Sequence, residues 1–195
     1  MRAFIAVTLP EDVRAAIAAD AAALRDAIPG VGWTKAESLH VTLKFLGSVD
    51  DPVPLWRAVV ERLAGRPAGS VAARGLGAFP SPRRASVLWA GIDDPAGALA
   101  ALAEETEAVA ERFGFEREKR SYTPHVTIGR ARRGPVDASA PIAAAAGRRF
   151  GVVPVDGVVL FESRPGPAGS QYIERGRVPL GQGASHGDSG EDRHP

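Results

Sequence analysis

The sequence predicts a protein of mixed helices and strands built from two similar halves, and three observations carry this prediction. The tetrapeptides HVTL (residues 40–43) and HVTI (residues 125–128) nearly repeat in a chain that holds four histidines. Each repeat lies 30 residues after a proline, Pro10 or Pro95, that opens a helical pattern. Each helical pattern follows a strand-like apolar run. The two halves therefore share a strand–helix–strand plan.

The first half begins with a strand over residues 4–7, followed by a helix. Thr8-Leu9-Pro10-Glu11 has the form of a Thr-x-x-Glu capping box with a proline in the first turn. Gly30 is expected to end this helix. The apolar residues that recur on one helical face, and predict its buried side, are Val13, Ile17, Leu24 and Ile28.

The second half repeats the plan, with a strand over residues 87–90 and a helix that begins after Asp94-Pro95 and is closed by Gly114. The inward face of this helix is expected to consist of Leu99, Leu102, Val109 and Phe113. Further strands are expected near residues 70–78, 151–161 and 171–178, and helices near 54–64 and 138–146.

Length and composition indicate one globular domain. The chain has 195 residues, 45% of them hydrophobic and 24% charged, as is typical of soluble globular proteins. We expect a single domain over residues 1–180 and a disordered polar tail over 181–195. The chain has no cysteine, which excludes disulfides, thiolate nucleophiles and iron–sulfur clusters and fits a cytoplasmic protein.

Charge and hydropathy narrow the classes of partner. The net charge is +1, so any affinity for nucleic acid must come from a local basic patch. The N-terminal apolar run is short and is followed at once by acidic residues, which is unlike a signal peptide. No stretch approaches the roughly 20 apolar residues of a membrane span, so no membrane partner is expected.

Strand alternation gives each His-Val-Thr motif an apolar and a polar face. The residues expected to point inward are Val41, Leu43, Val126 and Ile128. Those expected on the polar face are His40, Thr42, Lys44, His125 and Thr127. If a pseudo-twofold axis relates the halves, the polar faces meet across one cleft, where two imidazoles and two hydroxyls converge.

Such a group of side chains suits phosphoryl chemistry without a metal. One imidazole can take a proton from the attacking oxygen while the other protonates the leaving oxygen. The threonine hydroxyls can donate hydrogen bonds to non-bridging phosphate oxygens. A Ser-His-Asp hydrolase and a metallohydrolase have less support, since the chain has no G-x-S-x-G, H-x-H or H-E-x-x-H motif. The alternatives are solvated surface histidines and a metal site formed by His186 and His194 of the tail.

The segments HVTLKFLG and YTPHVTIGR resemble the two His-x-Thr-x motifs of the two-histidine (2H) phosphoesterase superfamily. Within it, the chain is most similar to the bacterial RNA 2′,3′-cyclic phosphodiesterases, formerly called 2′-5′ RNA ligases. The similarity extends from the opening AFIAVTLP to about residue 178. It implies a bilobal, pseudo-twofold α+β fold, with two antiparallel sheets and outer helices around a central cleft.

The resemblance also implies an activity, namely hydrolysis of RNA 2′,3′-cyclic phosphate ends to 2′-phosphomonoesters with no metal and no cofactor. His40 would be the proton donor to the departing 3′-oxygen, and His125 the proton acceptor that activates water. Thr42 and Thr127 would bind the phosphate. Joining of RNA ends through a 2′-5′ linkage is the related ligase reaction, with an RNA 5′-hydroxyl in place of water. The alternative from a different functional class is a noncatalytic module that binds RNA ends.

Phe45 and Arg130 stand at equivalent offsets after the two histidines, where family members sandwich the terminal base. Regular alternation, however, directs both side chains toward the Val41 and Val126 faces. Either each strand bends after its fourth residue, or Phe45 belongs to the core.

The expected partner is RNA with a 2′,3′-cyclic phosphate end, such as a tRNA half-molecule, bound by a monomer. The two basic groups that could follow RNA phosphates, or be solvated surface, are Arg83 with Arg84 and Arg117 with Lys119 and Arg120. The tryptophans, which are expected to pack rather than to stack on bases, are Trp33, Trp56 and Trp89.

Overall fold

The computed structural model describes residues 1–166 and 169–181. Residues 182–195, and with them nearly all of the expected tail, lie outside the described residues. The described part of the chain contains the helices α1 (Glu11–Ala23), α2 (Val53–Leu63), α3 (Ala98–Arg112) and α4 (Ser139–Ala144). Its strands are β1 (Arg2–Thr8), β2 (Val31–Trp33), β3 (His40–Ser48), β4 (Gly69–Phe79), β5 (Val87–Asp93), β6 (His125–Ala131), β7 (Arg149–Val155), β8 (Gly157–Arg164) and β9 (Gln171–Pro179).

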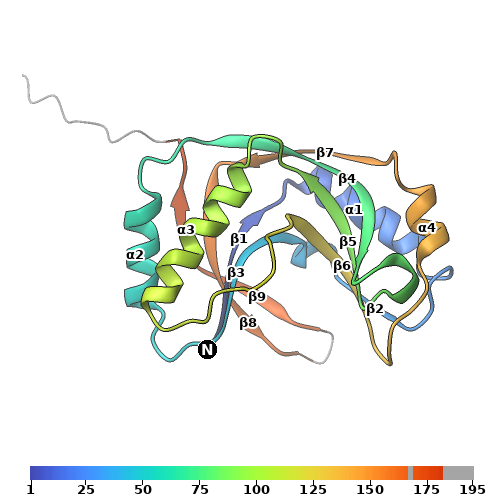
Figure 1. The fold of residues 1–195 in the computed structure, drawn as a ribbon, viewed down its shortest axis with the longest axis horizontal. Helices are drawn as coiled ribbons and strands as arrows, with labels where there is room; N and C mark the ends of the chain where they lie inside the picture. Colours follow the sequence, from blue (N-terminus) through green and yellow to red (C-terminus); the bar gives the residue numbers. More distant parts are fainter. Residues whose placement is uncertain (167–168, 182–195) are drawn as a thin grey trace, which may run out of the picture.

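The strands form an antiparallel, strongly curled sheet in the order β7-β4-β5-β6-β3-β1-β8-β9, with β2 paired to β6 (Figure 1). The order divides at its middle into two four-stranded halves, as the predicted bilobal α+β fold requires. These halves are continuous rather than separate sheets, because β3 pairs with β6 through Val41 and Val126.

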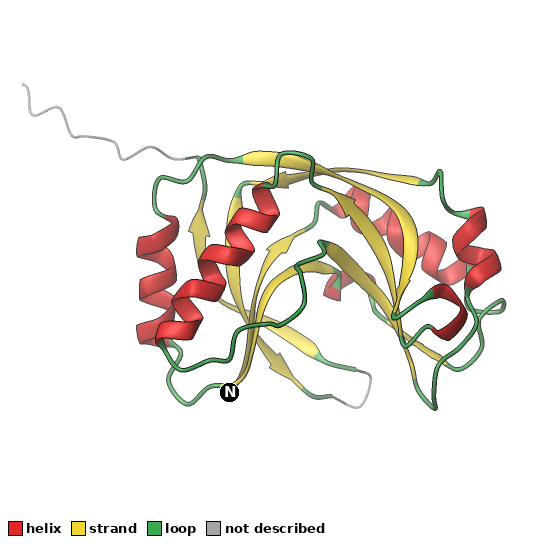
Figure 2. Cartoon of the chain, viewed as in Figure 1, coloured by secondary structure: helices red, strands yellow, loops and turns green. Residues whose placement is uncertain are grey.

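Each half of the sheet is covered by helices on its outer side (Figure 2). The helix that follows β1, α1, crosses over to pack on β7 and β6, and the helix that follows β5, α3, packs on β3 and α2. The two strand–helix–strand units therefore exchange their helices. This exchange ties the halves together around the β3–β6 boundary.

The core confirms most of the predicted inward faces. Val13 and Ile17 of α1 are fully buried, as are Leu99 and Val109 of α3. Phe113 was expected to point inward, but it lies just beyond the end of α3 and is 40% exposed.

Three local predictions are wrong. The Thr8 capping box is absent, since Pro10 is the N-cap residue of α1 and makes no side-chain cap. The helix ends at Ala23 rather than near Gly30, although Ile28 beyond it is still buried. The strand expected over 151–161 is two strands that flank Asp156, because β7 pairs in one half of the sheet and β8 in the other.

None of the helices within the described ranges combines the length and the apolar composition that a membrane crossing requires.

Strand β6 begins at His125, directly after Pro124, as the proline predicts.

Candidate active site

The two His-Val-Thr motifs lie on neighbouring antiparallel strands at the centre of the sheet. Val41 and Val126 are paired and fully buried. In an antiparallel pair the residue before one partner lies beside the residue after the other, so His40 is next to Thr127 and Thr42 is next to His125. The strand alternation places all four of these side chains on the face opposite the valines. The fold thus brings the predicted polar groups together.

A bulge follows each motif at its fourth residue. Along β3, Ile5 is opposite Lys44 and Ala6 is opposite Thr42, so Leu43 is the extra residue. Along β6, Leu88 is opposite Gly129 and Trp89 is opposite Thr127, so Ile128 is the extra residue. A bulge inserts one residue and therefore reverses the faces of the residues that follow it.

The reversal decides the position of Phe45. This side chain is 61% exposed on the cleft, so the alternative that placed it in the core is wrong. Arg130, after the second bulge, is exposed in the same cleft. Lys44, by contrast, was expected on the polar face with His40, but the bulge turns it inward and it is 6% exposed.

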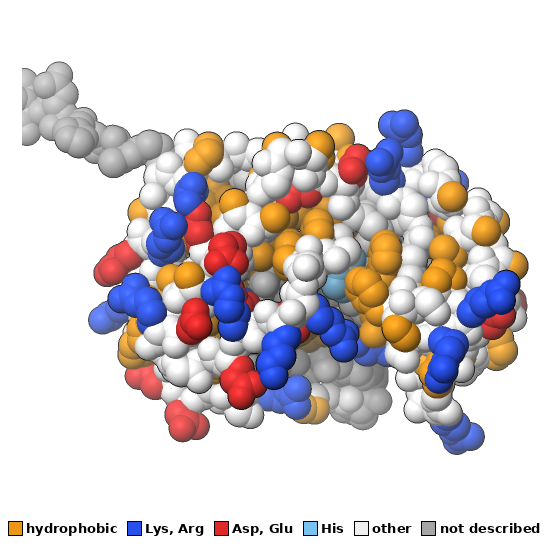
Figure 3. All heavy atoms as spheres, viewed as in Figure 1, with side chains coloured by type: hydrophobic (Ala, Val, Ile, Leu, Met, Phe, Trp, Pro, Cys, Tyr) orange, Lys and Arg blue, Asp and Glu red, His pale blue; other side chains and the backbone are white. Residues whose placement is uncertain are grey.

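The cleft is a cavity of about 750 Å³. Its lining includes Thr42, Phe45, His125 and Arg130 among the predicted site residues, but not His40 or Thr127. In Figure 3 histidine atoms are visible in the hollow between the two halves, with Lys and Arg side chains along its lower edge.

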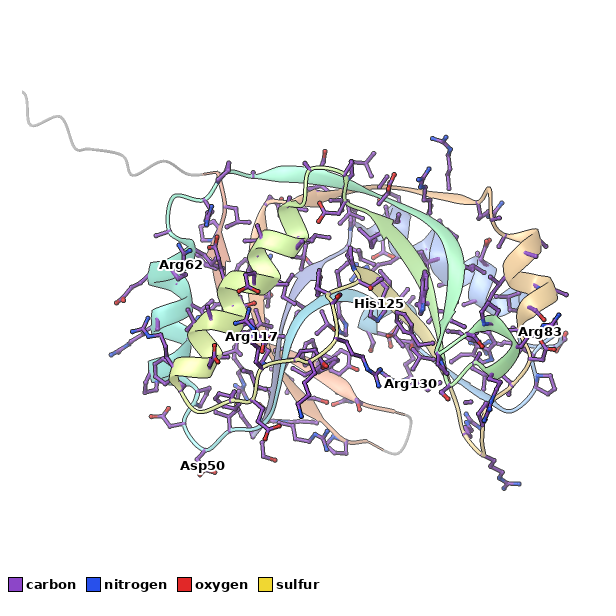
Figure 4. The ribbon with its side chains drawn as sticks, viewed as in Figure 1. Asp50, Arg62, Arg83, Arg117, His125 and Arg130 are labelled. Atoms are coloured by element: carbon purple, nitrogen blue, oxygen red, sulfur yellow. The ribbon has the colours of Figure 1, made fainter. Side chains whose placement is uncertain are left out.

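The two basic groups differ in position. Arg117, Lys119 and Arg120, from the segment before β6, line the cleft. Arg83 lines a separate pocket beside α4, and Figure 4 shows it far from His125 and Arg130. Arg117 is paired with Glu104 and Glu111, so part of its charge is compensated.

His40 is held by two short contacts. Its Nδ1 lies 2.8 Å from the Ser38 carbonyl oxygen, which can only accept, so Nδ1 carries the proton and donates it. Its Nε2 lies 3.1 Å from Thr42 Oγ1. Burial lowers the pKa of His40 to about 4, with smaller contributions from the charges of His125 and Arg130. The imidazole of the unliganded protein is therefore neutral at pH 7.

His125 is held in the same way. Its Nδ1 donates to the Thr123 carbonyl oxygen at 2.7 Å, which leaves Nε2 for a ligand. Burial, followed by the charge of Arg130, lowers the pKa of His125. The carbonyl two residues before the histidine is the acceptor in both motifs, so the pseudo-twofold relation extends to the hydrogen bonds.

The structure adds a tyrosine that the motifs did not indicate. Tyr122 is half-buried, lines the cleft and donates its hydroxyl to the Thr42 carbonyl oxygen at 3.0 Å. Burial raises its pKa, so it remains a donor at neutral pH. This bond joins the segment before the second motif to the strand of the first. The one signal in the sequence is an aromatic residue three positions before His125.

A buried ion pair borders the same cavity and was also missed. Lys44 Nζ donates to Glu107 Oε1 at 2.5 Å and to the Glu116 carbonyl oxygen at 2.7 Å. Glu107 Oε1 also accepts the backbone N–H of Glu118 at 2.9 Å. The pair thus anchors the segment that carries the cationic residues of the cleft.

Two of the three tryptophans pack as predicted. Trp33 and Trp56 pack against the core, and neither lines the cleft. Trp89 lies beside the site, with its ring centroid 6.2 Å from that of His125 and 5.2 Å from that of Phe79.

The fold and sequence are similar to those of known proteins. The family model described as LigT like Phosphoesterase matches residues 7–89 and 91–172. The RNA 2′,3′-cyclic phosphodiesterase of Aeropyrum pernix is 39% identical over 56% of this chain, an alignment that spans 64% of that protein. The protein of the same name from Archaeoglobus fulgidus is 31% identical, and the alignment covers 88% of this chain and 96% of that one.

The solved structure of TT0787 of Thermus thermophilus superposes with a TM-score of 0.77 at 28% identity, covering 92% of this chain and 98% of that one. The strongly curled antiparallel sheet with helices outside it is therefore a shared architecture. The family model covers most of the chain and includes both His-Val-Thr motifs. The chain belongs to the LigT-like phosphoesterase family.

Proposed function

We propose that the protein hydrolyses RNA 2′,3′-cyclic phosphate ends to 2′-phosphomonoesters in the cytoplasm, by acid–base catalysis between His40 and His125 without a metal ion. The observation that carries this proposal is the pairing of the two His-Val-Thr motifs on adjacent strands beside a cleft with basic side chains. Relatives named RNA 2′,3′-cyclic phosphodiesterase support the substrate class.

In this reaction His125 is the proton acceptor. Its Nδ1–H is engaged by the Thr123 carbonyl oxygen, so the lone pair of Nε2 is directed to a water molecule. The water oxygen bonds to phosphorus as Nε2 takes its proton. The bond from phosphorus to the 3′-oxygen breaks, and the phosphate remains on the 2′-oxygen.

His40 is the proton donor to the departing 3′-oxygen, which leaves as a hydroxyl. Because its pKa is about 4 in the free protein, His40 must gain a proton when substrate binds. The negative charge of the phosphodiester favours the imidazolium and so raises this pKa. Binding of the cyclic phosphate is therefore coupled to proton uptake.

The other candidate residues bind the substrate. Thr42 and Thr127 donate hydrogen bonds to the phosphate, and Phe45 and Arg130 stack on the terminal base. Lys119 and Arg120 lie where they can contact further phosphates of an RNA strand. A monomer suffices, since both motifs come from one chain.

The test is product analysis with an RNA oligonucleotide that ends in a 2′,3′-cyclic phosphate, in the presence of EDTA. We expect a 2′-phosphate end, which a nonspecific phosphomonoesterase removes, unlike the cyclic substrate, and which a 3′-specific phosphatase does not remove. The double variant His40→Asn/His125→Asn serves as the inactive control.

Three outcomes would contradict the proposal. If EDTA abolished the activity and a divalent ion restored it, the mechanism based on two imidazoles would be ruled out. Tight binding without turnover would indicate an RNA-end-binding module. Products joined through a 2′-5′ linkage, when a 5′-hydroxyl RNA is supplied and no hydrolysis occurs, would indicate a ligase.

A further inference from the structure

The two histidines have unequal surroundings. The imidazole of His40 is stacked on the ring of Phe4, with centroids 4.6 Å apart and planes at 29°. Phe4 is in turn stacked on Phe161 at 5.3 Å and 22°. Tyr172 meets His40 edge-on at 5.2 Å and 86°, and meets Phe4 in the same way at 4.9 Å. Rings from β1, β8 and β9 therefore enclose this one imidazole.

No ring of the described part of the chain is stacked on His125. Phe79 meets it edge-on at 5.2 Å and 83°, much as Tyr172 meets His40, and Trp89 is tilted at 6.2 Å. The strand register shows at which position the two halves of the sheet differ. Phe4 is opposite Phe45 on β3, and the corresponding residue opposite Arg130 on β6 is Val87.

This difference acts on the protonation of His40. An imidazolium loses hydration when it is enclosed by apolar rings, and the neutral form is then favoured. Burial is the largest cause of the low pKa of His40. Among the described residues, the titratable and charged groups that face His40 are His125, Arg130 and Tyr172, and none of them is a carboxylate that would stabilise the imidazolium.

We propose that Phe4, whose stacked ring has no counterpart at His125 among the described residues, is a positioning residue that encloses His40 together with Tyr172 and thereby makes the two otherwise equivalent histidines chemically unequal. Both residues lie outside the His-Val-Thr motifs, on strands β1 and β9. Phe4 fixes the plane of the imidazole by stacking, and Tyr172 flanks the edge of the stack that His40 and Phe4 form.

The inference deepens the proposed function and rests on it for its catalytic meaning. At neutral pH an enclosed His40 is a neutral imidazole with its proton on Nδ1 and none on Nε2, so it becomes a charged proton donor only when the phosphate binds. The more open His125 stays available as the acceptor. The aromatic enclosure thus assigns different roles to two motifs that are nearly identical in sequence.

The experiment is an NMR titration of the histidine ring protons in the full chain without substrate, with signals assigned by His40→Asn and His125→Asn. Tyr172→Ala opens the enclosure and should raise the pKa of His40 by about one unit, with a smaller change at His125. Tyr172→Phe keeps the ring and should leave the titration of His40 as in the wild type. Phe79→Leu is the matched variant for the other motif and should shift His125 instead.

An unchanged titration of His40 in Tyr172→Ala, or equal shifts of both histidines, would overturn the inference. Phe4 is 3% exposed, so Phe4→Leu is compared after circular dichroism has shown that it is folded. The pH profile of kcat/KM with a 2′,3′-cyclic nucleotide gives the catalytic readout, in which Tyr172→Ala should move the limb that belongs to His40. Because the NMR titration needs no turnover, an inactive wild-type protein would contradict the proposed function alone.

Discussion

Val41 and Val126 are paired across the centre of the sheet, and each is the second residue of a His-Val-Thr motif. Each histidine therefore lies beside the threonine of the other motif, although the two motifs stand in different halves of the chain. The candidate site exists because two distant segments meet in this register.

The histidine pair gives the first prediction. His40→Ala and His125→Ala should each lower kcat by about 10²–10⁴, since each removes one proton transfer. The double variant should fall by less than the product of the single effects, because both groups act in one step. Steady-state kinetics on a 2′,3′-cyclic nucleotide provide the measurement. A folded single variant that retains the wild-type rate would show that the remaining histidine works with another partner.

The threonines give the second prediction. Thr42→Val and Thr127→Val remove a hydroxyl and little volume, so each should lower kcat/KM by roughly fivefold to 150-fold, the effect of about 1–3 kcal/mol for one lost donor. Thr42 also lies 3.1 Å from the Nε2 of His40, so its variant should in addition change the pH profile. Wild-type kinetics for both variants would mean that these hydroxyls do not contact the phosphate.

The third prediction concerns pH. The profile of kcat/KM reports the free protein, in which burial lowers the pKa of both histidines, so its bell should be centred below the ordinary histidine value of about 6.5. The profile of kcat reports the complex, where the phosphate charge raises both pKa values, so its optimum should lie at higher pH. Rate measurements from about pH 4 to 9 test this order. Coinciding profiles would show that substrate binding does not change the protonation of the pair.

The exposed ring of Phe45 gives the fourth prediction. Stacking of a base on an aromatic side chain contributes about 1–3 kcal/mol, so Phe45→Ala should raise KM about fivefold to 150-fold with little change in kcat. Phe113→Ala is the matched control, because this phenylalanine is 40% exposed and does not line the cleft. Equal KM values for the two variants would exclude a stacking role for Phe45.

The fifth prediction concerns the buried ion pair. Lys44→Met leaves Glu107 as an unpaired buried charge and should lower the free energy of unfolding by about 3–5 kcal/mol. Lys44→Met/Glu107→Leu removes both charges and should cost less. Arg177→Met breaks an exposed pair with Glu174 and serves as the control, with an expected cost of at most about 1 kcal/mol. Urea unfolding measures all three, and equal costs for the Lys44 and Arg177 variants would contradict the prediction.

Much of the site could be predicted because the positions of its residues depend on patterns of neighbouring residues in the sequence. The alternation around Val41 and Val126 correctly separated the buried apolar residues from both histidines and both threonines, but it was wrong for Lys44. The equal offsets of Phe45 and Arg130 placed both residues in the cleft, provided that each strand bends after its fourth residue. The catalytic and binding roles of these residues remain predictions.

The sequence by itself determined the paired motifs, the apolar faces of α1 and α3 and the start of β6 after Pro124, since each depends on neighbouring residues. Other features could not be predicted from periodicity. The break at Asp156 depends on which half of the sheet each flanking strand joins.

Tertiary structure alone decided the bulges at Leu43 and Ile128, the inward turn of Lys44 toward Glu107 and the stacking of Phe4 on His40. Strand register and ring contacts are relations between segments far apart in the chain, and a local pattern carries no information about them. The repeat thus specified two equivalent histidines, and the packing of β1 and β9 made their surroundings different.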